Sequence, residues 1–125
     1  MRRTIALLLA IALLSACGAG APRQTAETDS YTVTFELAGA GMDERVATVE
    51  VTDKSGQAVD AEQVVIAPVM RDMGMASPEV VAQRERPGRY TARGAFFSML
   101  GEWEMDVRVS AGGAEETASF TVQVE

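Results

Sequence analysis

The stretch GEWEMDVRV, residues 101–109, alternates between apolar and charged side chains from Glu102 onward. On an extended strand, one face would carry the apolar side chains of Trp103, Met105, Val107 and Val109. A period of two residues is typical of a β-strand with one face in a core and the other in solvent. Because Trp103 offers the largest apolar area in the sequence, we predict that it anchors that core.

Related patterns recur on both sides of this stretch. Alternation or a continuous apolar run predicts further strands at residues 31–37, 47–52, 64–69, 79–83, 90–93 and 118–124. Turn-forming phrases such as DKSG and AGG separate the strands, and no segment after residue 30 has a sustained helical period. Seven short strands joined by turns predict an all-β fold, a seven-stranded antiparallel immunoglobulin-like β-sandwich over residues 31–125.

The first residues predict an export signal. Two arginines precede an apolar run at 5–14, which is too short to span a bilayer as a helix. The phrase LSAC at 14–17 resembles a bacterial lipobox, in which cleavage precedes a cysteine that is then lipidated. We therefore predict a lipoprotein signal peptide at 1–16 and lipidation of Cys17, the single cysteine of the chain. The alternative is an ordinary secretory signal in which this cysteine is incidental.

The segment after the cysteine predicts how the folded domain is attached to the membrane. Residues 17–30 are small and polar beyond Cys17, which predicts a flexible linker. The lipid would bind the protein to a membrane of the bacterial cell envelope. Gly18 stands where an inner-membrane retention aspartate often sits, which favours the outer membrane, facing the periplasm, in a host with two membranes. We also expect the linker to enter the first strand at the end away from the methionines discussed below.

Composition excludes several classes of function. The chain has 11 basic and 18 acidic residues, a net charge of −7, which argues against nucleic acid as a partner. It has no histidine, so the commonest general base and the commonest metal ligand are absent. The carboxylates of Glu102, Glu104 and Asp106 fit a solvated strand face better than an acid–base pair. We therefore predict that the protein is not an enzyme.

The methionines are the most informative side chains of the exported part. If successive strands alternate in direction, the loops after the first, third and fifth strands share one end of the sandwich. Five methionines fall in or beside those loops, namely Met42, Met70, Met73, Met75 and Met99. A cluster of thioether sulfurs is a soft, neutral ligand set that suits Cu(I). The five residues are therefore candidate Cu(I) ligands.

Two other interpretations of the same methionines remain open. Methionine is a flexible apolar filler, so Met70 and Met99 could plug the end of the sandwich beneath Phe96 and Phe97. Alternatively, the methionines could form an apolar surface for a partner protein. The residues alone do not choose between metal binding, packing and docking.

Four phrases together resemble a known family. They are DKSGQAV at 53–59, MRDMGM at 70–75, PGRY at 87–90 and FSMLGEW at 97–103. Their order resembles the YtkA-like domain family, small exported bacterial sandwiches related to the FixH-type proteins of cytochrome oxidase assembly. The resemblance covers about residues 31–125 and implies an envelope location and copper handling. The lack of histidine near the methionine phrase disfavours a Cu(II) site.

We therefore expect a lipid-anchored envelope domain that binds Cu(I) weakly and passes it to a cuproprotein or another envelope protein. The alternative is a structural or protein-interaction module without a metal, whose methionine-rich end packs or docks on a partner.

Overall fold

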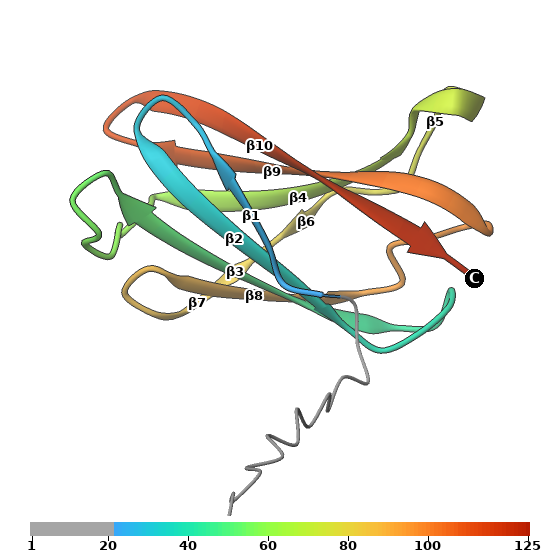
Figure 1. The fold of residues 1–125 in the computed structure, drawn as a ribbon. Helices are drawn as coiled ribbons and strands as arrows, with labels where there is room; N and C mark the ends of the chain where they lie inside the picture. Colours follow the sequence, from blue (N-terminus) through green and yellow to red (C-terminus); the bar gives the residue numbers. More distant parts are fainter. Residues whose placement is uncertain (1–21) are drawn as a thin grey trace, which may run out of the picture.

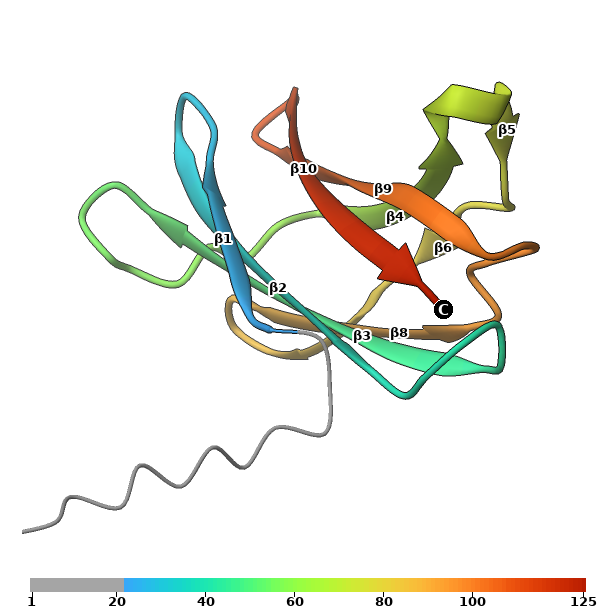
Figure 2. The ribbon, with the colours of Figure 1, turned by 45° about the vertical axis from the view of Figure 1, so that its right-hand side comes forward.

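Two antiparallel sheets pack face to face in the computed structural model, which describes residues 22–125 (Figures 1 and 2). One sheet has the order β1 (Gln24–Glu27), β2 (Tyr31–Ala38), β3 (Arg45–Asp53), β8 (Arg89–Gly94) and β7 (Gln83–Arg86). The other has the order β10 (Ala114–Val124), β9 (Gly101–Ala111), β4 (Gln63–Met70) and β5 (Met75–Ala76), with β6 (Val80–Val81) also paired to β4. The all-β prediction and the two-sheet sandwich are confirmed. No helix in the described range is long and apolar enough to cross a membrane.

The core lies between the sheets and is built by the alternating residues. The inward side chains of β9 are fully buried: Trp103, Met105, Val107 and Val109. Across the core, the rings of Phe35 and Phe120 stack with centroids 5.1 Å apart. Full burial of side chains of this size stabilises a fold by about 1.5–3 kcal/mol each. Trp103 thus lies where the sequence predicts, inside the sandwich.

The structure has ten strands in the described residues rather than the seven predicted. One difference is the predicted strand 79–83, which is divided between the sheets. Val80 and Val81 pair with β4 as β6, and Gln83 then begins β7 against β8 in the other sheet. Ala82 lies at the crossing, and its N–H donates to the carbonyl of Val64 at 2.8 Å. A short apolar pattern cannot show that the chain changes sheets within it.

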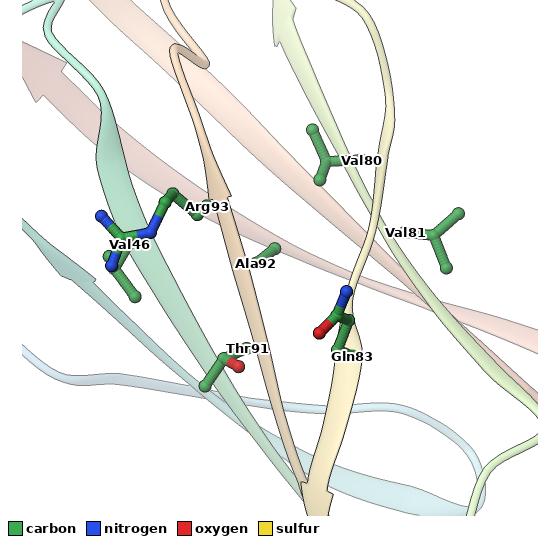
Figure 3. A pocket seen from close by; sticks show the side chains of 7 residues that line it. All are labelled: Val46, Val80, Val81, Gln83, Thr91, Ala92 and Arg93. Carbon is green, nitrogen blue, oxygen red and sulfur yellow. The ribbon is translucent and has the colours of Figure 1, made fainter.

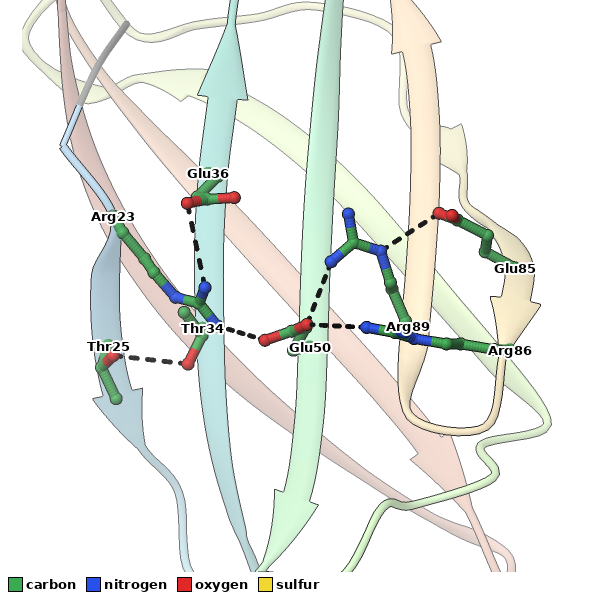
Figure 4. A network of polar contacts seen from close by, with 8 residues as sticks. All are labelled: Arg23, Thr25, Thr34, Glu36, Glu50, Glu85, Arg86 and Arg89. Atoms are coloured by element: carbon green, nitrogen blue, oxygen red, sulfur yellow. Dashed lines mark hydrogen bonds and ion pairs between the residues drawn. The ribbon is translucent and has the colours of Figure 1, made fainter. Parts of the chain in front are cut away.

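Two further strands were not predicted: the two-residue strand β5, and β1, which lies inside the predicted flexible linker 17–30. Residues 24–27 pair antiparallel with β2, and the hydroxyls of Thr25 and Thr34 lie 3.3 Å apart. Just before the strand, the Arg23 guanidinium forms an ion pair with Glu50 of β3 (Figure 4). Polar residues at a sheet edge are held by backbone hydrogen bonds and ion pairs, so a search for apolar alternation misses them. The predicted signal peptide and Cys17 lie outside the described residues.

Strand β1 also changes where the chain enters the sandwich. Gln24 pairs with Phe35 and Glu27 with Thr32, so β1 runs antiparallel to β2 before turning into it. Arg23 consequently lies 3.9 Å from Glu36, near the end of β2 that leads to the first methionine loop. The expectation that the linker enters at the opposite end is wrong, because β1 runs back along β2 before the chain turns into that strand.

Candidate functional site

Three loops that carry methionines meet at one end of the sandwich. They are residues 39–44 between β2 and β3, 71–74 between β4 and β5, and 95–100 between β8 and β9. The first and third adjoin because Arg45 pairs with Gly94, and the Arg45 guanidinium lies 5.5 Å from the centre of the Phe97 ring. We call these three loops, with the strand ends that bear them, the Met end.

Contacts around Gly101 and Gly41 connect the second sheet to the same end. A Cβ built on Gly101, the first residue of β9, would lie only 3.1 Å from the Met70 methyl carbon at the end of β4. A Cβ on Gly41 would lie 3.8 Å from the carbonyl oxygen of Glu125. The last residues of β4 and β10 and the first of β9 therefore border the methionine loops, as Figures 1 and 2 also show.

The β4–β5 hairpin exposes two of its three methionines. After Met70, residues 71–73 form a single turn of 3-10 helix, and Gly74 ends it with a left-handed φ of 61° that favours glycine. The hairpin leaves Met73 and Met75 with 59% and 38% of their surface exposed, whereas Met70 keeps 3%. The first methionine of the phrase therefore packs into the core, and the other two face solvent.

Arg71 fastens this hairpin to the outer face of β9. Its guanidinium binds Glu104, and its Nη2 lies 3.0 Å from a carboxylate oxygen of Asp106. Hydrogen bonding to Glu104, aided by the negative charge of Asp106, raises the pKa of Arg71. Two of the carboxylates that the sequence assigned to a solvated face thus position the loop that carries Met73.

The β8–β9 loop is held by Trp103. The indole N–H of Trp103 donates to the carbonyl oxygen of Met99 at 2.9 Å. The Met99 side chain is partly buried and packs against the core, to which the buried rings of Phe96 and Phe97 also belong. Leu100, the next residue, is 55% exposed. The burial of Met70 and the partial burial of Met99 agree with the packing interpretation of these two residues.

Arg45 holds the third loop, a role that the sequence analysis did not identify. It is the one charged residue among the described residues that is buried, with 5% of its surface exposed. Its guanidinium donates to the carbonyls of Ala38 at 3.2 Å, Gly39 at 3.1 Å and Gly41 at 3.4 Å. Burial lowers the pKa of Arg45. These bonds fix the loop from which Met42 projects, 45% exposed.

The five candidate ligands do not form one compact group. Met70, Met73 and Met75 share the hairpin, and Met99 lies two residues before Gly101, which abuts Met70. Met42 lies beside the end of β10, and the sheet order places β4 and β9 between β10 and β5. At about 4.8 Å per strand, β10 is about 14 Å from β5. Within residues 22–125, no three His, Cys, Asp or Glu side chains are placed to share a metal ion.

The side of the sandwich has a hollow of about 440 Å³ where β6 passes to β7 (Figure 3). Val81, 56% exposed, and Thr91 contribute to its lining. Its one charged lining residue is Arg93, which is paired with Glu44 at 3.1 Å. The side chains around this hollow offer no pair of groups suited to catalysis.

Comparison with known proteins bears on the fold and the family. A family model described as YtkA-like matches residues 25–108. No curated protein matches the chain closely enough to count as a relative. Among solved structures, one described as the crystal structure of a Br derivative of BhCBM56 is 17% identical, with a TM-score of 0.52. That similarity covers 79% of this chain and 97% of the other, and at this identity it concerns the fold alone.

Proposed function

This chain belongs to the YtkA-like family, and from that premise we propose that it is a lipid-anchored protein of the bacterial cell envelope that binds Cu(I) weakly. The Met end would supply the ligands. The observation that carries the proposal is the β4–β5 hairpin, which presents Met73 and Met75 to solvent on either side of a single glycine. We assign no catalytic role.

The chemistry of the hairpin supports Cu(I) rather than a harder cation. Thioether sulfur is a soft, neutral donor, and soft donors select Cu(I), whereas carboxylate and water oxygens suit Mg²⁺ or Ca²⁺. Exposed methionine is also vulnerable to oxidation, so its presence at two positions in one turn calls for an explanation. Met99, on the neighbouring loop, is the third ligand in this proposal. Met70 is buried in the core beside these residues, and Met42 lies outside the proposed ligand group.

Weak binding fits a protein that transfers copper. Two or three neutral sulfurs on an exposed loop provide no charge to offset the loss of water from the ion, and the bound ion stays accessible. A cuproprotein or another envelope protein could then remove the ion by offering thiolate or imidazole ligands. Transfer is therefore the role that we propose, rather than storage.

The entry point of the chain constrains how the anchor would hold the domain. Cys17 precedes Pro22, the first described residue, by five positions. A fully extended chain of five residues spans at most about 18 Å, so a lipid on Cys17 would hold Pro22 within about that distance of the membrane. Pro22 directly precedes Arg23, which is paired with Glu36 on the half of β2 that leads to the Met end. The proposed anchor would therefore keep the Met end near the membrane surface.

We also infer that the sandwich is of the immunoglobulin-like type. Its orders β2-β3-β8-β7 and β10-β9-β4 match the A-B-E-D and G-F-C orders of that fold, with β1, β5 and β6 as short additions.

A titration with Cu(I) tests the proposed function. The chain would begin at residue 17 and carry Cys17→Ser, which removes its single thiol, a competing Cu(I) ligand. Competition against a chromogenic Cu(I) chelator, without oxygen and under reducing conditions, gives the affinity. We expect one copper per chain. The double variant Met73→Leu/Met75→Leu preserves apolar volume and should weaken binding by at least about tenfold, or 1.4 kcal/mol.

The matched control is Met105→Leu, which makes the same chemical change at a fully buried position on β9, where the sulfur is closed off from solvent. It should leave Cu(I) affinity unchanged. Equal affinity for the parent chain and the double variant would contradict the proposal, as would binding no tighter than that of a chain with every methionine replaced. A metal-free interaction module would then be the better account. The exposure of Leu100, which has no metal-binding atom, favours that alternative.

A further inference from the structure

We propose that the Met end is also a docking surface for a protein that presents an apolar patch ringed by lysine and arginine. This inference goes beyond the proposed metal binding and does not depend on it, because it rests on exposed apolar area and on charge.

Most of the exposed apolar side chains lie at one end of the sandwich, in two parts: Met73, Met75 and Leu100 near the tip of the β4–β5 hairpin, and Met42 beside the end of β10. Five large apolar side chains are exposed in the described residues, and four of them lie at the Met end: Met42, Met73, Met75 and Leu100. The fifth, Val81, lies on the side of the sandwich. Single exposed apolar residues are ordinary, but a group gathered on one surface and bordered by polar residues marks an interaction site.

Free carboxylates border this centre. Asp43 follows Met42, Asp72 precedes Met73, and Glu102 follows closely after Leu100. Glu125 reaches the same end beside Gly41. All four carboxylate residues are exposed. Within residues 22–125, none of them takes part in an ion pair: Asp43, Asp72, Glu102 and Glu125.

The arginines at this end do not neutralise that border. Arg71 is bound to two carboxylates of β9, and Arg93 is paired with Glu44 at 3.1 Å. Arg45 is buried and donates to backbone carbonyls. The local excess of negative charge therefore remains, and it would accelerate the approach of a cationic partner and align it on the apolar centre.

The same charge disfavours other occupants. A second copy of the chain would bring an identical acidic border against this one, and like charges across an interface cost free energy. The anionic headgroups of a membrane would be repelled for the same reason, even where the proposed anchor brings this end close to the membrane surface. A protein with a basic border complements both the apolar centre and its rim, so it is the occupant that we propose.

A synthetic peptide tests this surface without knowledge of the natural partner. The probe is a fluorescent amphipathic helix of leucine and lysine, and its control is the same helix with glutamate in place of lysine. Fluorescence anisotropy with the chain from residue 17, carrying Cys17→Ser, should show binding of the lysine peptide alone. Raising the salt to about 0.5 M should weaken that binding by about tenfold, because screening shortens the reach of exposed charges.

Matched variants then locate the binding surface. Asp43→Asn/Asp72→Asn removes two unpaired charges at the Met end and should weaken peptide binding by about fivefold, because each substitution removes a carboxylate that would pair with a lysine of the peptide. The control Asp29→Asn/Glu62→Gln removes two exposed charges near the opposite end of the sandwich. It should change the affinity for the peptide less than twofold. A second matched pair tests the apolar centre: Leu100→Ser should weaken binding, and Val81→Ser should not, although the two residues are 55% and 56% exposed.

The variant Met73→Leu/Met75→Leu separates docking from metal binding. It retains the apolar area but removes two sulfurs, so it should bind the peptide like the parent while losing Cu(I). Loss of Cu(I) binding alone therefore leaves the docking surface intact. Equal effects of the two charge variants, or of the two serine variants, would overturn the docking proposal. So would dimerisation through this end, seen by sedimentation, in place of peptide binding. Unfolding midpoints confirm that each variant is folded.

Discussion

Met70 and Met75 lie directly opposite each other across the β4–β5 ladder, yet Met70 is 3% exposed and Met75 is 38% exposed. Strand β5 is only two residues long, and it lies at the edge of its sheet. Met70 is covered by the start of β9, whereas the rim position of Met75 leaves much of its side chain in solvent. One short phrase of sequence thus supplies both a core residue and a surface residue.

This difference predicts unequal stability effects. Met70→Ala should lower the free energy of unfolding by about 2–5 kcal/mol, because it removes a buried side chain and leaves a cavity. Met75→Ala should change it by no more than about 0.5 kcal/mol. Urea unfolding of both variants measures the difference, and similar losses would show that the assigned burial is wrong.

Trp103 both fills the core and supports the β8–β9 loop. Trp103→Ala should cost about 3–5 kcal/mol, which approaches the whole stability of a small domain. Trp103→Phe keeps an aromatic ring but removes the donor to the Met99 carbonyl, which is worth about 1 kcal/mol. In thermal unfolding, the melting temperature should therefore be highest for the parent, lower for Trp103→Phe and lowest for Trp103→Ala. An alanine variant that melts with the parent would contradict the placement of Trp103 in the core.

Arg45 should stabilise the loop that carries Met42. Arg45→Met keeps much of the apolar stem but leaves the carbonyls of loop 39–44 without their charged donor, at a cost of about 1.5–3 kcal/mol. Amide hydrogen exchange in residues 39–44 should become faster. The control is Arg93→Met on a neighbouring strand, whose exposed ion pair with Glu44 is worth at most about 1 kcal/mol. Equal effects of the two substitutions would refute the special role of Arg45.

The contacts of Glu50 should make the stability of the fold depend on pH in the acid range. Burial raises its pKa, but the hydrogen bond from Arg89 and the charge of Arg23 outweigh this and bring the pKa below its usual 4.5 (Figure 4). A carboxyl whose pKa is lower in the folded state stabilises that state above its unfolded pKa, and the stabilisation is lost as the pH falls through the folded value. Glu50→Gln should therefore be less stable than the parent at neutral pH, and the two should converge below pH 4.5. A difference that does not change with pH would contradict this.

Lipidation of Cys17 is a separate prediction from the sequence. In a bacterial host, the full chain should be recovered in the membrane fraction with a lipid mass on its N-terminal cysteine. Cys17→Ser should abolish both. Mass spectrometry makes the test, and an unchanged lipid mass in the variant would exclude this residue as the attachment point.

The major strands could be predicted because their burial follows the alternation of the sequence. In β9 from Glu102 to Val109, and in β10 from Thr117 to Val124, buried apolar residues alternate with polar residues on the outer face, so local pattern alone places these parts of the strands. Strand β1 escaped because three of its four residues are polar, so it shows no apolar alternation, and because the ion pair beside it joins Arg23 to Glu50, 27 positions along the chain. The division of 79–83 between two sheets likewise depends on the positions of β4 and β8, which local pattern does not encode.

The common end of the methionine loops followed from the alternation of strand direction, but their internal arrangement did not. Nothing in the phrase MRDMGM indicates that Met70 is buried and Met75 exposed, because that depends on Gly101 packing against Met70. Arg71 and Arg45, the residues that hold these loops, could not be predicted for a similar reason. Arg71 finds its carboxylates more than thirty positions away, and Arg45 uses backbone carbonyls, which have no sequence signature.

Methyl NMR of the chain with isotope-labelled methionine tests the central claim most directly, because each methionine reports on itself. On addition of one equivalent of Cu(I), the methyl signals of Met73, Met75 and Met99 should shift. The signals of Met42 and of the buried Met105 should stay in place. If no signal moves, or if Met42 and Met105 shift as much as the hairpin methionines, the copper-binding account of the Met end is contradicted.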